Sequence, residues 1–121
     1  AVADCGYTSV WDIFSNKIKN NFKMHEFPTL FCANTVNKIY SGFDFKEASS
    51  IEQLKKSKTP TIFIHGEKDT FVPYEMLDKV YNAAACEKDK VTIPNSPHAR
   101  NACANPDLYW SSILDFINKY I

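Results

Sequence analysis

The amino-acid sequence predicts an α/β fold in which a short parallel sheet of about three strands is flanked by helices. Three observations predict it. Apolar runs alternate with helical patterns along the chain, which is the order that a parallel sheet with crossover helices requires. Residues 61–64 form a continuous apolar and β-branched run, typical of a strand buried on both faces. Residues 106–121 are amphipathic and predict a long closing helix.

The first half of the chain predicts one short strand and three helices. Residues 1–4 form a brief apolar run that we interpret as the end of a strand. From Thr8 onward, apolar residues recur every three or four positions and predict a helix. A second helical pattern follows Pro28 and ends near Gly42, and a third covers residues 49–56.

The second half predicts two further strands, each followed by a helix. The apolar run at 61–64 precedes a helix over residues 75–85, and a short strand is expected over residues 90–94. After a loop through His98 comes the closing helix. Its apolar positions are Leu108, Trp110, Ile113, Leu114, Phe116, Ile117 and Ile121.

Composition narrows the class of protein. The chain has 121 residues, 45% of them hydrophobic, which fits one domain. Fourteen basic residues balance fourteen acidic ones without a block of either sign, so we expect no nucleic-acid partner. No apolar run approaches the roughly 18 residues of a membrane span. A cytoplasmic location is expected, unless upstream residues carry a signal or a membrane anchor.

The cysteines and histidines show no metal-binding spacing. The four cysteines contain no Cys-x-x-Cys pair, and we expect them to be reduced and mostly buried, with two disulfides as the alternative in an oxidising compartment. Neither His25 nor His65 has a plausible third ligand. We therefore expect no metal site and no cofactor.

Two loops hold residues suited to acid–base chemistry. Asp69 follows the predicted strand at 61–64, and His98 follows the next predicted strand. Reactive groups of α/β sheets gather beyond the carboxyl ends of the strands. A carboxylate at one imidazole nitrogen fixes the tautomer, so that the other nitrogen can take a proton from a hydroxyl nucleophile. Asp69 and His98 are the candidate catalytic residues.

The same segments resemble the α/β-hydrolase family. The resemblance is carried by Pro60-Thr-Ile-Phe-Ile-His-Gly-Glu-Lys-Asp-Thr-Phe-Val-Pro73 and by Asn95-Ser-Pro-His98 after the next strand. In that family the triad order is nucleophile, acid, histidine, with the acid after the penultimate strand and the histidine after the last. The resemblance implies that Asp69 is the triad acid and His98 the base.

The opening Ala-Asp-Cys-Gly-Tyr7 resembles the strand after the nucleophile helix in serine hydrolases of the bacterial-esterase and prolyl-oligopeptidase-like subgroup. The resemblance implies that residues 1–121 are the C-terminal part of an α/β-hydrolase fold. Residues 8–58 would be a small helical cap insertion, and residues 59–121 would supply the acid strand, the histidine loop and the closing helix.

The family's Gly-x-Ser-x-Gly nucleophile elbow occurs nowhere in this sequence. No serine here sits on such a turn, and we interpret Cys5 as a small buried thiol instead of a nucleophile. The nucleophile and the oxyanion hole are therefore expected upstream, and the chain alone is expected to be inactive. A sheet cut beside its central strands would expose an edge that favours dimerisation or strand exchange.

Each candidate residue also has a structural explanation. Asp69 could cap the helix that begins near Pro73, and His98 could be a solvated loop histidine. Asp4 could be an alternative acid, although a turn role is favoured. His65 is expected to pack or hydrogen-bond beneath the site.

The sequence thus predicts the C-terminal fragment of a serine hydrolase that cleaves an ester, amide or related acyl bond of a small-molecule substrate. The alternative is a non-catalytic α/β domain that binds a ligand or a protein. The distance from Asp69 to His98 distinguishes the two, because a triad pair lies within about 2.6–3.2 Å.

Overall fold

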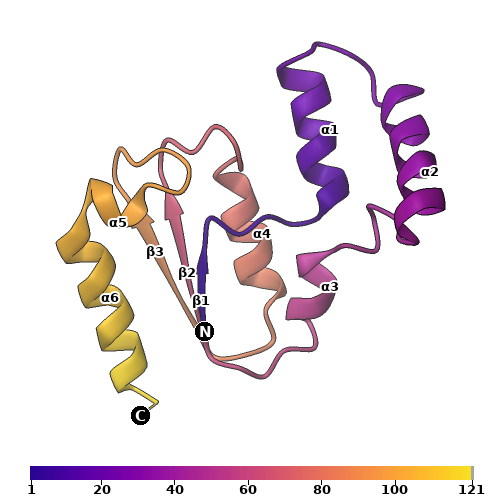
Figure 1. The fold of residues 1–121 in the computed structure, drawn as a ribbon. Coiled ribbons are helices and arrows are strands. Elements are labelled where there is room, and N and C mark those ends of the chain that lie inside the picture. Colours follow the sequence, from indigo (N-terminus) through magenta and orange to yellow (C-terminus); the bar gives the residue numbers. More distant parts are fainter. Residues whose placement is uncertain (121) are drawn as a thin grey trace. The chain divides into compact units, whose positions relative to one another are not determined.

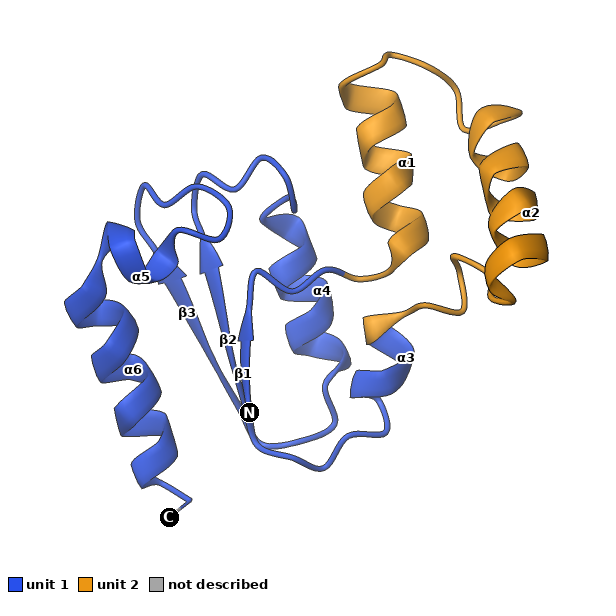
Figure 2. Ribbon diagram, viewed as in Figure 1, with its two compact units in different colours: residues 1–7, 51–121 blue, residues 8–50 orange. Residues whose placement is uncertain are grey.

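A computed structural model describes residues 1–120 of the chain (Figure 1). The chain divides into two compact units (Figure 2). One comprises residues 1–7 and 51–121, and the other comprises residues 8–50. The first unit is a three-stranded parallel sheet flanked by helices, so the predicted α/β fold is confirmed.

The sheet has the order β1-β2-β3. These strands are β1 (Val2–Asp4), β2 (Thr61–Gly66) and β3 (Lys88–Ile93), and both pairings are parallel. All six residues of β2 are buried, as the continuous apolar run predicts for a strand covered on both faces. Because the strands are parallel, their carboxyl ends lie along one edge of the sheet (Figure 1).

Alternate residues of β2 pack against different helices, as the two-residue period of a strand requires. Ile62 and Ile64 belong to one core cluster with helix α6 (Pro106–Asn118). Phe63 belongs to a second cluster with helix α4 (Glu75–Ala83). The buried helical residues of these clusters are Tyr109, Ile113 and Phe116 in α6, and Leu77 and Val80 in α4.

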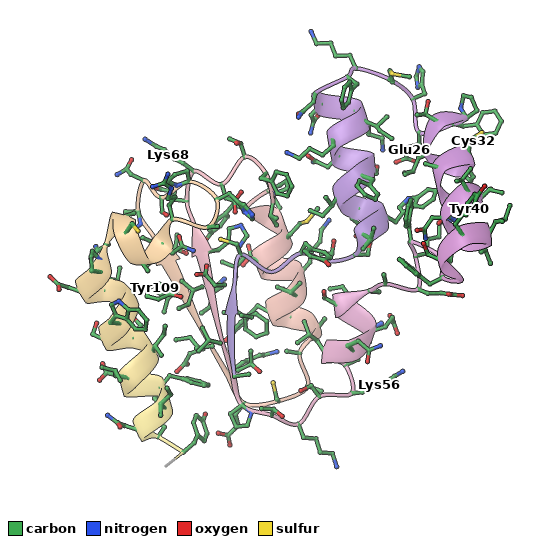
Figure 3. The ribbon with its side chains drawn as sticks, viewed as in Figure 1. Glu26, Cys32, Tyr40, Lys56, Lys68 and Tyr109 are labelled. Carbon is green, nitrogen blue, oxygen red and sulfur yellow. The ribbon has the colours of Figure 1, made fainter. Side chains whose placement is uncertain are left out.

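The closing helix is confirmed as α6, but its buried face differs from the apolar pattern. Trp110 and Leu114 are exposed, whereas Tyr109, which Figure 3 labels on α6, is buried. The Tyr109 hydroxyl donates a hydrogen bond to Asp4 Oδ2 over 3.0 Å, so its polar end is satisfied inside the first unit. Ile121, which the sequence pattern placed on the apolar face, lies outside the described residues.

Helix α5 (Asn101–Ala104) was not predicted from the sequence. Four residues are too few to show a 3.6-residue period. Its first residue, Asn101, is almost fully buried and makes side-chain contacts with the end of β1. None of the helices in residues 1–120 is both long enough and apolar enough to span a membrane.

The second unit contains α1 (Val10–Asn20) and α2 (Thr29–Ser41), and α3 (Ser50–Leu54) follows it. Ser9 caps α1 by accepting a hydrogen bond from the Asp12 amide. The helices are confirmed, but the apolar side chains of α2 are largely exposed, with Leu30 its only fully buried residue. Figure 3 labels Cys32 and Tyr40 on α2, and both are exposed.

We predict that Gly66→Ala destabilises the fold. A Cβ at position 66 would lie 2.4 Å from the Ser96 carbonyl oxygen and 3.0 Å from Asn101 Oδ1. Because the first contact is with backbone, the loop after β3 must shift, and the free energy of unfolding should fall by about 1–3 kcal/mol. Urea unfolding measures this change in the free energy of unfolding. Gly6→Ala is the control, since nothing lies within 4 Å of its Cβ position; equal midpoints for the two variants would contradict the prediction.

Candidate active site

The loops that follow β2 and β3 are joined by hydrogen bonds at the carboxyl edge of the sheet. The Glu67 amide donates to the Ile93 carbonyl over 3.0 Å, and the Lys68 amide donates to the Ser96 carbonyl over 3.0 Å. The Asn95 amide returns a bond to Glu67 Oε2. Two main-chain hydrogen bonds and one bond to the Glu67 side chain thus hold the two loops together, without any contribution from Asp69 or His98.

These loops bring Asp69 and His98 into direct contact. His98 Nδ1 lies 2.7 Å from Asp69 Oδ2, within the range expected for a triad pair. An ionised carboxylate can only accept hydrogen bonds, so Nδ1 donates and Nε2 is left with its lone pair. That is the tautomer in which the imidazole can accept a proton from a nucleophile.

Asp69 is also fixed from its own loop. Its Oδ1 accepts hydrogen bonds from the Phe71 and Val72 amides, over 2.9 and 2.8 Å. Burial acts to raise the pKa of Asp69, but the hydrogen bonds from His98, Val72 and Phe71 together outweigh it. The pKa of Asp69 is thus held below its ordinary value, and the carboxylate is ionised at neutral pH.

His65 lies beneath this pair and is completely buried. Its Nε2 is 3.0 Å from the Val72 carbonyl oxygen and 3.4 Å from Asp69 Oδ2. Since a carbonyl oxygen only accepts, Nε2 donates and supports the turn that carries Asp69. The expectation that His65 hydrogen-bonds beneath the site is confirmed, and its Nδ1 has no partner among the described residues.

His98 lines a pocket of about 300 Å³. The pocket is lined by Asp4, Cys5, Tyr7, Phe71, Val72, His98 and Ala99. The His98 side chain is 34% exposed, while that of Asp69 is inaccessible. The Phe71 ring packs against the imidazole, with the two ring centres 4.8 Å apart. A buried acid with a partly exposed base is the arrangement that proton transfer to a bound substrate needs.

Asp4 does not serve as an alternative acid for His98 in this structure. Its Oδ1 accepts a hydrogen bond from Asn101 Nδ2 over 2.5 Å, and its Oδ2 accepts the one from the Tyr109 hydroxyl. Burial, followed by this bond to Asp4, raises the pKa of Tyr109. Asp4 therefore ties the start of the fold to α5 and α6, directly after the His98 loop.

Cys5 is a buried thiol, as the sequence predicts, and the structure also places it beside Asp69 and His98. Its backbone φ is 53°, and its Sγ accepts hydrogen bonds from the Ala99 amide and Asn101 Nδ2. The pKa of the Cys5 thiol is raised to about 11, mainly by burial. The free thiol is therefore protonated and is not an activated nucleophile.

The expectation that the cysteines are mostly buried is wrong. All four are free thiols, but Cys32 and Cys103 are exposed and Cys86 is partly exposed. Cys32 is the fourth residue of α2 and Cys103 the third of α5, and each lies on a solvent-exposed side of its helix. His25 is exposed, as predicted.

A protein-family model described as "Serine hydrolase (FSH1)" matches residues 13–99, which is well over half of the chain and includes both Asp69 and His98. The chain belongs to the serine hydrolase (FSH1) family. The resemblance to α/β-hydrolases seen in the sequence is thereby confirmed at the level of the family.

Two curated relatives are similar over different spans. The uncharacterized protein YqkD of Bacillus subtilis (strain 168) is 21% identical over 118 residues, which is 98% of this chain and 39% of that protein. The alpha/beta hydrolase domain-containing protein WAV2 of Arabidopsis thaliana is 27% identical over 74 residues, which is 59% of this chain and 24% of that protein. The chain thus spans well under half the length of either relative.

A solved structure shares the fold. It is titled "Putative non-heme bromoperoxidase BpoC" from Mycobacterium tuberculosis H37Rv, and it superposes with a TM-score of 0.52 at 17% sequence identity. The superposition covers 57% of this chain and 25% of that one. At that identity the similarity supports the α/β-hydrolase fold alone.

We predict that Asp69 contributes to the acid sensitivity of the fold. Its pKa is lower in the folded chain than the value of about 3.9 expected on unfolding, so the unfolded state binds more protons in acid. Its contribution to stability is present above that pH and is lost as the pH falls through the folded pKa. Urea unfolding between about pH 5 and pH 3 should therefore show a shallower loss of stability in Asp69→Asn than in the wild type.

Asp115→Asn is the matched control for that measurement, because it removes one carboxylate from the exposed side of α6. If the two variants lose stability with the same slope, Asp69 does not hold the hydrogen bonds described here.

Proposed function

We propose that this chain supplies the acid and the base of a serine hydrolase that cleaves an ester, amide or related acyl bond. The observation that carries the proposal is the 2.7 Å contact between Asp69 Oδ2 and His98 Nδ1, in a chain of the serine hydrolase family. Asp69 is the orienting carboxylate, and His98 is the general base and then the general acid.

In the proposed reaction, a serine hydroxyl attacks the acyl carbon while His98 Nε2 takes its proton. Asp69 stabilises the imidazolium that forms, because its carboxylate stays ionised and hydrogen-bonded to Nδ1. The imidazolium then protonates the leaving alcohol or amine. His98 then takes a proton from water as the water attacks the acyl-enzyme, and it passes that proton to the serine oxygen as the acid product leaves. No cofactor is required for these steps.

We further propose that the nucleophile lies outside residues 1–121. The sequence contains no Gly-x-Ser-x-Gly elbow, and the chain covers 39% and 24% of its two curated relatives. Among residues 1–120, β1 pairs only with β2, so its other edge can accept a further strand. In the isolated chain, a second copy could pair at the same edge and give a dimer.

The pocket beside His98 supports a partly apolar acyl substrate, because Phe71, Val72, Tyr7 and Ala99 line it. The alternative of a non-catalytic binding domain places no requirement on the distance between Asp69 and His98. That contact therefore favours the hydrolase.

A fluorophosphonate probe, which labels activated serines, tests the proposal on the complete product of the gene that encodes this chain. We expect one labelled serine outside residues 1–121, and no labelling of the 121-residue chain by itself. In the complete protein, Asp69→Asn and His98→Ala should each lower kcat/KM for a p-nitrophenyl acyl ester by about 10³-fold or more.

His25→Ala is the control, because His25 is exposed and outside the unit that holds the site. Wild-type turnover in both site variants, or labelling of a serine within residues 1–121, would overturn the proposal.

A further inference from the structure

Three residues of metal-binding type meet beside the pocket, one from the end of each strand. Cys5 follows β1, Asp69 lies in the loop after β2, and His98 lies in the loop after β3. One ligand atom from each of the three lies within 4.8 Å of the others. We propose that this cluster binds a borderline-soft divalent cation such as Zn²⁺, which separates Asp69 from His98 and inhibits proton transfer by the pair.

The distances are compatible with such an ion after a small adjustment. Zn²⁺ binds thiolate sulfur at about 2.3 Å and imidazole nitrogen or carboxylate oxygen at about 2.0–2.2 Å. The ligand atoms of a tetrahedral site therefore lie roughly 3.3–3.8 Å apart. The side chains of Asp69 and His98 must separate slightly from their 2.7 Å contact, and the Cys5 sulfur must approach them.

Two hydrogen-bond donors are directed at the Cys5 sulfur. The Ala99 amide donates to Cys5 Sγ over 3.5 Å, and Asn101 Nδ2 donates over 3.3 Å. A thiol sulfur is a weak acceptor, whereas N–H groups directed at a metal-bound thiolate are a common supporting shell. Asn101 is 1% exposed and is itself held by Asp4, so these donors are fixed before an ion arrives.

The Asp69 carboxylate is also held in place by hydrogen bonds before an ion arrives. Asp69 Oδ1 is occupied by the Phe71 and Val72 amides, which leaves Oδ2 directed at the imidazole. Outer hydrogen bonds of this kind orient the ligands of metal sites.

Charge and access also fit a divalent ion. One thiolate and one carboxylate balance its two positive charges. As the ion binds, the thiol proton leaves to solvent, and the His98 proton moves from Nδ1 to Nε2 through solvent so that the Nδ1 lone pair faces the ion. The partly exposed His98 side chain gives the ion a path from the pocket, and the pocket leaves a fourth position for water. The three ligands are neutral with the ion bound, and the neighbouring Asp4 carboxylate is stabilised by its hydrogen bonds from Asn101 and Tyr109.

Binding of the ion is independent of the proposed hydrolase activity, and only its inhibitory effect rests on that function. An ion at these atoms takes the imidazole away from the Asp69 carboxylate, so His98 is no longer oriented to accept a proton. A chelator would reverse the inhibition.

Cobalt(II) titration of the 121-residue chain tests the site, with Cys32, Cys86 and Cys103 changed to Ser so that Cys5 is the only thiol. We expect one Co²⁺ per chain, a thiolate-to-cobalt charge-transfer band, and displacement of Co²⁺ by Zn²⁺. Cys5→Ser should abolish the band, and His98→Ala and Asp69→Asn should each weaken binding about tenfold or more. His25→Ala should bind as the parent does.

Circular dichroism without metal establishes that each variant is folded. If Cys5→Ser does not fold, His98→Ala carries the test, because its side chain is 34% exposed. A folded parent with no charge-transfer band overturns the site. The site is also overturned if both His98→Ala and Asp69→Asn bind Co²⁺ with the parent's affinity, because the thiol would then bind cobalt without them. Failure of the esterase assay alone leaves the binding result standing.

Discussion

The parallel pairing of β2 with β3 determines where Asp69 and His98 meet. It places the two following loops at one edge of the sheet, and the main-chain bonds from Glu67 and Lys68 then close the gap between them. Gly66 makes that closure possible, because the space its missing side chain would fill is taken by the Ser96 carbonyl. The geometry of the backbone thus brings together the two loops that carry the side chains of the site.

The buried carboxylate explains why so many groups surround Asp69. A charge removed from water costs free energy unless hydrogen bonds replace its hydration. Two amides of its own loop and the imidazole of His98 supply those bonds, and His65 holds the turn from below. The result is a carboxylate that stays ionised and can hold His98 in one tautomer, which is the property that acid–base chemistry needs.

Much of this fold could be predicted from the sequence, because its strands and longer helices have strong local patterns. The run at 61–64 predicted a buried central strand, and strand-end placement predicted that Asp69 and His98 lie together. Helix α5 could not be predicted, since it is held by the side chain of Asn101 and not by a local period.

The roles of Asp4 and Cys5 were equally hidden in the sequence. Asp4 accepts hydrogen bonds from Asn101 and Tyr109, which lie 97 and 105 positions further along the chain. The donors to Cys5 Sγ are more than 90 positions away from it. No local pattern carries such contacts. Tyr109 is buried in place of Trp110 because it lies on the same face of α6 as Ile113 and Phe116, and its hydroxyl is satisfied there by Asp4.

The most direct test is NMR of the 121-residue chain with isotope-labelled histidine, at a pH where the imidazoles are neutral. The Asp69–His98 contact predicts that the His98 proton resides on Nδ1 and exchanges slowly with water, and that Asp69→Asn abolishes this preference. A His98 proton that resides mainly on Nε2, and that is unaffected by Asp69→Asn, would contradict the hydrogen bond on which the candidate site depends.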